Sequence, residues 1–244
     1  MTKIRKIALQ PTPILLLALC FLLFSCKDSF NSEVKNSFTG EELFNGIFLA
    51  RGPVAKEIAT VDNQVKLTDL ISTDDPKYKE AILFYDLIVK TIGEDNPSFF
   101  NNFKDNVYSG NHIVIKETLT KAANIYITAV QKISGLNEND LATLVNTVVS
   151  KNNLLSPNGS VSKENLKKFI QNATNSEVNS GSRSTCLAFA AIVAVAVIAV
   201  LAVIGMWGAV LVKWLIWPKT RIAEDNNSSL MLDQLINDIA VTLK

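Results

Sequence analysis

Few side chains in this sequence carry reactive groups. It has three cysteines and one histidine, and its cationic and anionic residues nearly balance, which leaves a net charge of +1. Cys26 ends the stretch Leu-Phe-Ser-Cys at residues 23–26, which resembles a lipobox because a small residue precedes the thiol. In such a motif a peptidase cuts before the cysteine, and the thiol then carries diacylglycerol. We therefore predict that Cys26 is lipidated.

The residues before Cys26 have the composition of an export signal. Lys3, Arg5 and Lys6 are followed by an apolar stretch at 14–24 that suits a signal peptide and is short for a membrane span. We predict a lipoprotein signal peptide at 1–25 and a polar leader at 26–37. Two or more acyl chains would then anchor the exported protein to the cell envelope. A signal peptide with an incidental cysteine is the alternative.

The remaining candidates for catalysis are weak. His112 follows a turn, where a lone histidine is far more often solvated than catalytic, and Cys186 has no basic partner next to it. The sequence contains no Gly-rich phosphate loop, metal-ligand cluster or nucleophile–base spacing. We therefore expect no enzyme, catalytic residue, metal or cofactor. Nucleic acid is not an expected partner, because the cations are not gathered on one face.

The elements that would position any site are helices. Apolar residues recur at spacings of three and four, and no convincing alternation with period two occurs. Thr39 and Glu42 have the spacing of a capping box. We expect Gly52 to end a first, short helix, Gly93 to end the next helix, which starts at Asp75, and Asp140 to cap a later one.

These patterns predict an all-α fold with several regions. A small helical bundle occupies 38–172, and a linker at 173–185 lacks large apolar residues. A hydrophobic membrane-inserting region at 186–221 forms a long helix or a helical hairpin. An amphipathic tail at 222–244 either docks on the bundle or lies on the membrane.

The hydrophobic region contains an uncharged stretch from Leu187 to Val212, which we call the apolar run. Its Leu, Ile, Val and Phe side chains favour insertion by roughly 4 to 8 kcal/mol. At ~1.5 Å per residue the run reaches about 39 Å, more than the ~30 Å of a bilayer core. A buried core helix is the alternative, but the bundle is too small to surround it. The positions assigned to lipid contact are Leu187, Val195, Val200, Ile204 and Leu211.

The end of the run has the composition of a membrane interface. Aromatic residues beside cations are typical of that boundary. A single tilted span fits the length, and residues 205–208 would alternatively allow a hairpin. A lone strand is excluded because lipid leaves its backbone unpaired. The predicted interfacial anchors are Trp207, Lys213, Trp214 and Trp217.

A specific motif lies at the start of the bundle. Residues 38–56 read FTGEELFNGIFLARGPVAK, which resembles the opening of the sporulation-delaying protein (SdpC) family of bacterial toxin precursors. The order of signal, helical region, linker, apolar segment and tail is also similar. The residues that carry the motif are Phe38, Gly40, Glu41, Phe44, Gly46, Phe48, Gly52 and Lys56.

The resemblance implies that 38–172 is a pro-domain and that the region 186–221 is released as an antimicrobial peptide. Such a peptide enters bacterial membranes and collapses their ion gradient. The implied partners are the lipid bilayer, processing proteases, export machinery and a cognate immunity protein in the membrane. The family peptide has a second cysteine six residues after the first, where this chain has Ile192, so an internal disulfide is excluded.

Two alternatives remain open at the level of sequence. One is a lipoprotein whose helical domain is permanently anchored by the apolar run, in a structural or adaptor role. The other concerns topology. If the run halts during export, the positive-inside rule places Lys213 and the tail in the cytoplasm. If the chain passes through whole, the bundle shields the run.

Overall fold

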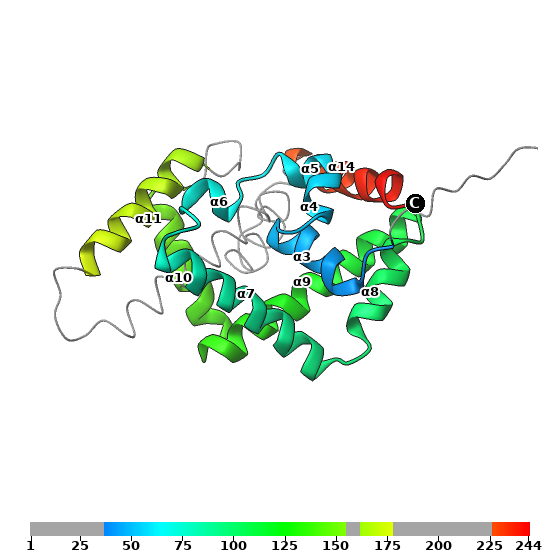
Figure 1. Cartoon of the computed structure of the whole chain (residues 1–244), viewed down its shortest axis with the longest axis horizontal. Helices are drawn as coiled ribbons and strands as arrows, with labels where there is room; N and C mark the ends of the chain where they lie inside the picture. The colour runs from blue at the N-terminus through cyan, green and yellow to red at the C-terminus, as the bar shows by residue number, and fades with distance from the viewer. Residues whose placement is uncertain (1–36, 155–161, 178–225) are drawn as a thin grey trace, which may run out of the picture. The chain divides into compact units, whose positions relative to one another are not determined.

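The computed structural model describes residues 37–154, 162–177 and 226–244, and the regular structure in these ranges is helical (Figure 1). No strand occurs in them, which confirms the all-α prediction for this part of the chain. The helices are α3 (Gly40–Leu49), α4 (Val54–Glu57), α5 (Ala59–Asp62), α6 (Leu67–Leu70), α7 (Pro76–Asp95), α8 (Phe99–Val107), α9 (His112–Ser134), α10 (Glu138–Lys151), α11 (Lys163–Glu177) and α14 (Asn226–Thr242).

Several predicted features lie outside the described residues. These are the signal peptide at 1–25, Cys26 with most of the polar leader, and the hydrophobic region 186–221 with its lipid-facing and interfacial positions. Within the described ranges, no helix is both long and apolar enough to cross a membrane. Helix α11 continues to Glu177, so the first residues of the predicted linker are helical.

The first helix begins as predicted but ends earlier. The capping box of Thr39 and Glu42 is formed, so the amino-terminal prediction is confirmed. The left-handed residue that closes the helix is Ala50 (φ 47°), whose N–H donates to the carbonyl of Asn45. Gly52 also has a positive φ of 82° but lies beyond the cap, so its prediction as the cap was wrong.

Two other predicted helix boundaries were also wrong. Helix α7 continues through Gly93 to Asp95, because a lone glycine costs a helix only about 1 kcal/mol. Helix α10 is capped by Asn137, not by Asp140. The Asn137 side chain accepts from the Asp140 amide, which places Asp140 in the first turn instead.

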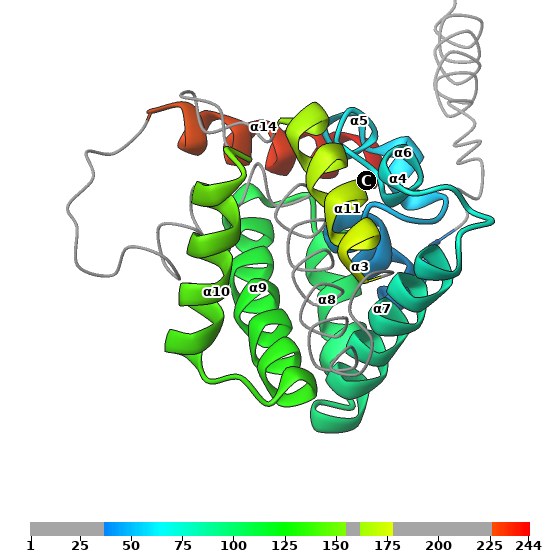
Figure 2. The ribbon, with the colours of Figure 1, turned by 90° about the vertical axis from the view of Figure 1, so that its left-hand side faces the viewer.

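The short helix α3 packs against one long helix and two short ones. Helix α3 contacts α4, α7 and α8, while α9 contacts α7 and α8 (Figure 2). Helix α14 lies on α5 and α9, and α11 lies on α6. The buried apolar side chains of these helices form one cluster. The compact unit begins at Phe38, the first residue of the motif.

Candidate functional site: the motif helix and the attachment of the flanking helices

The motif residues divide into buried and exposed sets. The aromatic rings of Phe44 and Phe48 are fully buried. Gly40 and Gly46 are buried as well, and Phe38 is half-buried with its amide donating to the Tyr108 hydroxyl at 2.9 Å. The exposed members of the motif are Glu41, Gly52 and Lys56. Most of the motif is therefore explained by packing.

The two buried glycines permit very close helix contacts. A Cβ atom on Gly40 would lie 1.9 Å from the backbone oxygen of Phe100. A Cβ atom on Gly46 would lie 2.4 Å from Cβ of Val54, a residue that is fully buried. No side chain fits at such distances, so these glycines hold α3 directly against α8 and α4.

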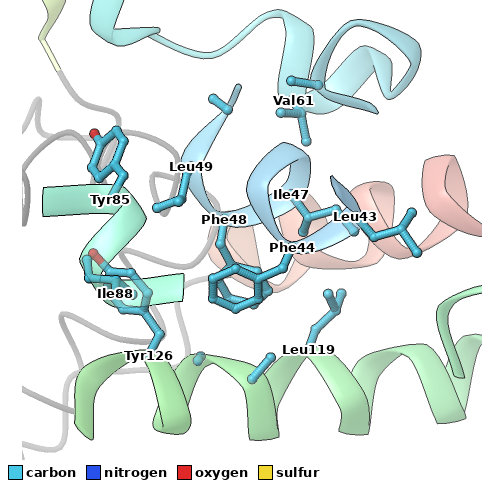
Figure 3. Close-up of a cluster of buried hydrophobic side chains, with 14 of the residues drawn as sticks. Leu43, Phe44, Ile47, Phe48, Leu49, Val61, Tyr85, Ile88, Leu119 and Tyr126 are labelled. Carbon is cyan, nitrogen blue, oxygen red and sulfur yellow. The ribbon is translucent and has the colours of Figure 1, made fainter. Parts of the chain in front are cut away.

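Phe44 is the centre of an aromatic cluster. Its ring stacks on Phe48 with centroids 4.8 Å apart and meets Phe99, Phe100 and Phe103 edge-on at 5.8 to 5.9 Å. Figure 3 shows the Phe44 and Phe48 rings between α3 and α9. Edge-to-face and offset arrangements of this kind add about 0.5 to 1.5 kcal/mol per pair beyond area burial.

Two tyrosine hydroxyls lie inside this core. Burial raises the pKa of Tyr126 well above its ordinary value and raises that of Tyr85 as well. The Tyr126 hydroxyl has no hydrogen-bond partner within the described part of the chain. Both hydroxyls therefore stay neutral near pH 7.

The capping box adds electrostatic support at the start of α3. The Thr39 amide donates to Oε2 of Glu42 at 2.8 Å, and the Glu42 amide donates to Oγ1 of Thr39 at 3.2 Å. The bond from the Thr39 amide, followed by that from its hydroxyl, holds the pKa of Glu42 below its usual value. The carboxylate is thus an acceptor at neutral pH, which favours this helix terminus.

Helix α14 attaches to the bundle by an apolar face and one carboxylate. Asp238 of α14 accepts from the backbone amide of Thr60 at 3.0 Å and also from the Thr60 hydroxyl. The sequence predicted the apolar face but not its partner, because Thr60 and Asp238 are far apart in the chain. The buried residues of α14 are Leu232, Leu235, Ile236, Ile239 and Ala240, and Leu243 directly after the helix is buried as well.

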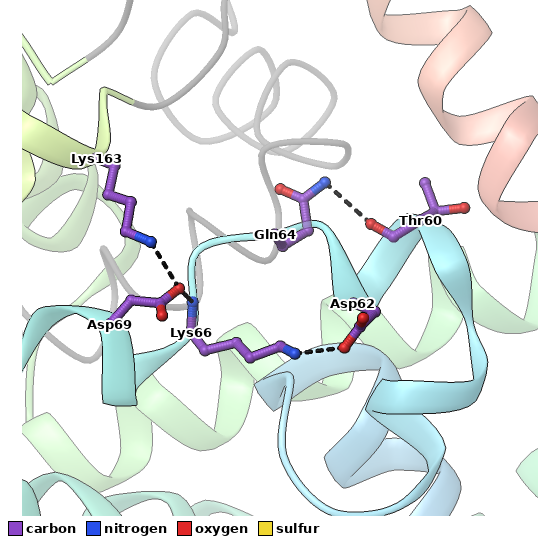
Figure 4. Close-up of polar contacts among 6 residues, drawn as sticks. All are labelled: Thr60, Asp62, Gln64, Lys66, Asp69 and Lys163. Carbon is purple, nitrogen blue, oxygen red and sulfur yellow. Dashed lines mark hydrogen bonds and ion pairs between the residues drawn. The ribbon is translucent and has the colours of Figure 1, made fainter.

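Helix α11 attaches by a different set of contacts, of which Figure 4 shows the pair of Lys163 and Asp69. Nζ of Lys163 lies 3.0 Å from Oδ2 of Asp69 in α6, and Leu166 is fully buried. Partial burial alone would raise the pKa of Asp69. The hydrogen bond from the Lys66 amide and then that from the Lys163 ammonium lower this pKa by more, so the net shift is downward. Asp69 is therefore ionised at neutral pH and pairs with Lys163.

The start of α11 is also held by backbone contacts. The Ser162 amide donates to the carbonyl of Leu154 at 2.8 Å. The side-chain amide of Asn165 donates to the carbonyl of Asn153, also at 2.8 Å. No sequence signal predicted these contacts, since they join the end of α10 to α11 across residues 155–161.

The described residues bring few reactive side chains together. His112 is the exposed first residue of α9. Within 37–154, 162–177 and 226–244, no group of His, Cys, Asp and Glu side chains has the arrangement of a metal site. The fold and the motif define a class: an all-α domain whose most specific sequence pattern serves helix packing, and which holds the helices on both sides of an apolar segment.

Comparison with known proteins agrees with the motif. A model of the sporulation delaying protein family toxin matches residues 35–244. This chain belongs to that family, and the resemblance drawn from residues 38–56 is confirmed. The match begins just before the folded unit at Phe38 and includes the whole apolar run.

A relative in Bacillus subtilis strain 168 is also similar. It is the uncharacterized protein YitM, 33% identical over 121 residues that cover 47% of this chain and 59% of the relative. This chain therefore aligns with less than two thirds of that protein's length. No solved structure matches the chain.

Proposed function

We propose that this chain is an exported precursor from which a membrane-active antimicrobial peptide is cut. The peptide comprises the region 186–221, inserts in bacterial membranes and dissipates their ion gradient. Membership of a toxin family supports the toxin class, and the family match extends across this region. The observation that carries the mechanism is the uncharged apolar run, which ends beside tryptophans and cations.

Whether the apolar run stays in water or enters the bilayer depends on the free energy of its transfer from water to lipid. Its apolar side chains contribute roughly −4 to −8 kcal/mol at the bilayer centre. Lys213 opposes insertion by at most ~3 kcal/mol, and by less at the end of the run, where its side chain reaches the interface. Insertion is therefore favoured for a single span.

A synthetic peptide covering Cys186 to Trp217 tests this mechanism. We expect it to depolarise bacterial cells and to release dye from liposomes at micromolar concentration. Val200→Lys places a cation near the middle of the run and costs about 2.5 to 3.5 kcal/mol, or roughly a hundredfold in membrane partitioning. Activity of this variant should fall to background.

The matched control is Val212→Lys, which places the same charge next to Lys213 at the end of the run. It should retain most of the activity, since a terminal lysine reaches the interface. Equal killing by the Val200→Lys and unmodified peptides would contradict an inserted mechanism, and an inert unmodified peptide would contradict the proposed function.

The proposal assigns roles to the other regions without requiring catalysis or a cofactor. The signal and Cys26 export the precursor and tether it to the cell envelope, and the domain from Phe38 is the pro-domain. Export machinery and processing proteases act on the precursor, and an immunity protein in the membrane protects the producing cell. Mass spectrometry of culture medium should find a fragment that starts near Cys186. A permanently anchored lipoprotein would release none.

A further inference from the structure

The two helices that flank the hydrophobic region are attached to neighbouring parts of one short stretch of chain. Helix α11 precedes the region and contacts α6, whereas α14 follows it and contacts α5. Helices α5 and α6 both belong to residues 59–70, which we call the connecting segment. The connecting segment thus contacts both flanks, and α9 completes the surface on which α14 lies.

Each attachment combines burial with a polar contact. On the α14 side, Leu235 and Ile239 are fully buried and Asp238 accepts from two groups of Thr60. On the α11 side, Leu166 is fully buried and Lys163 pairs with Asp69. The two attachments rest on separate contacts, so either can be disrupted by a separate substitution.

This arrangement constrains how the precursor meets a membrane. A chain that crosses a bilayer once leaves its two flanks on opposite sides, and a helix on one side cannot pack on a domain on the other. We infer that docked α14 keeps both flanks on the side of the bundle, so that in the precursor the apolar run crosses the bilayer twice or not at all. The single-span orientation requires α14 to leave the connecting segment first.

The charges around the run favour a single span, with the tail and the bundle on opposite sides of the membrane. This preference competes with the docking of α14. Arg183 precedes the run, while Lys213, Lys219 and Arg221 follow it, a bias that favours a cytoplasmic tail for a single span. Docking of α14 opposes that orientation. The inference uses the membrane affinity of the run from the proposed function, but neither peptide release nor toxicity.

A test of topology uses the full chain in intact spheroplasts. One epitope is added after Lys244, and a second is inserted between the exposed residues Thr73 and Asp74. An antibody that does not cross membranes should label both epitopes equally. Leu235→Asp buries a carboxylate in the α14 contact, and should make the carboxyl-terminal epitope at least twofold less accessible than the other.

Val241→Asp is the matched control. It introduces the same charge on the same helix at a position 68% exposed, and should leave the labelling ratio at one. Opposite accessibility of the two epitopes in the unmodified chain would overturn the inference. Equal labelling in the Leu235→Asp variant would also overturn it, because docking would then not determine the side of the tail.

A second measurement covers the case in which Leu235→Asp fails to fold. Thr60→Cys with Asp238→Cys, in a chain carrying Cys186→Ser, should form a disulfide in the exported protein. After a protease cut between the flanks, the two fragments should stay joined until a reductant is added. Thr60→Cys with Val241→Cys, on the outer face of α14, should not join them. Fragments that separate without reductant in the first pair would contradict docking in the exported precursor, whether or not the released peptide is toxic.

Discussion

The aromatic core around α3 and the attachments of α11 and α14 are held by different kinds of contact. In the core, Phe44 meets several rings and Gly46 lies directly against α4, so the fit depends on the shape of each residue. In the attachments, α11 and α14 each present an apolar face and a polar pair to the connecting segment. We therefore expect the first kind to tolerate little substitution and the second to open before the rest of the core.

The largest effect should come from Phe44→Ala. Its ring is fully buried and central to the aromatic cluster, so its removal should lower the free energy of unfolding by about 3 to 5 kcal/mol. Denaturant unfolding of the full chain measures this. Leu83→Ala, at an α7 position 66% exposed, is the control and should change little. A loss below 1 kcal/mol for Phe44→Ala would remove the distinction between the two regions.

A pair of glycine substitutions should give effects of opposite sign. Gly46→Ala forces a Cβ into Val54 and should destabilise the domain by about 1 to 3 kcal/mol. Gly93→Ala, also inside a helix, brings its Cβ only to ordinary contact at 3.5 Å from Phe100. It should stabilise by up to about 1 kcal/mol, because alanine is the better helix former. Thermal unfolding of both variants checks the signs, and the same sign for both would contradict the packing explanation.

The smallest effect should be confined to α11. Asp69→Asn removes the charge that pairs with Lys163, and should cost about 0 to 1 kcal/mol since the pair is half-exposed. Hydrogen exchange should accelerate in α11 and stay unchanged in α8. Equal acceleration in both helices would show that the attachment and the core open together.

Lowering the pH should also accelerate hydrogen exchange in α11, as Asp69→Asn does. The pKa of Asp69 is lowered in the folded protein, so its contribution is complete above the ordinary aspartate value, near pH 3.9. That contribution is lost as the pH falls through the lower folded value. Asp69→Asn should abolish this part of the pH dependence of α11 exchange.

Local features of the fold were predictable from sequence, and distant contacts were not. The capping box of Thr39 and Glu42 depends on residues three apart, so spacing alone identified it. The spacing of apolar residues by three and four likewise identified the buried faces of α9 and α14, whereas in α7 it did not single out the buried Phe84 and Ile88. Gly93 misled the prediction because a glycine inside a helix has a small cost that tertiary packing outweighs.

The candidate site was only partly predictable for the same reason. The motif named Gly40 and Gly46, but only the fold shows that Phe100 and Val54 leave no room beside them. The docking of α14 was an open alternative, since an amphipathic stripe specifies a buried face and not its partner. The hydrogen bond from Thr60 to Asp238 joins residues on either side of the apolar run, so no pattern of residues within one helix can predict it.

The position of α14 in the chain determines when folding of the domain can be completed. Ribosomes deliver residues in order, and the residues of the surface on α5 and α9 are made long before Asp238 emerges. The apolar side chains of that surface stay exposed to solvent or to chaperones while the apolar run is being made. Helix α14 covers that surface when it arrives, so a covered surface on α5 and α9 marks a chain in which the run has already been made and followed by its tail.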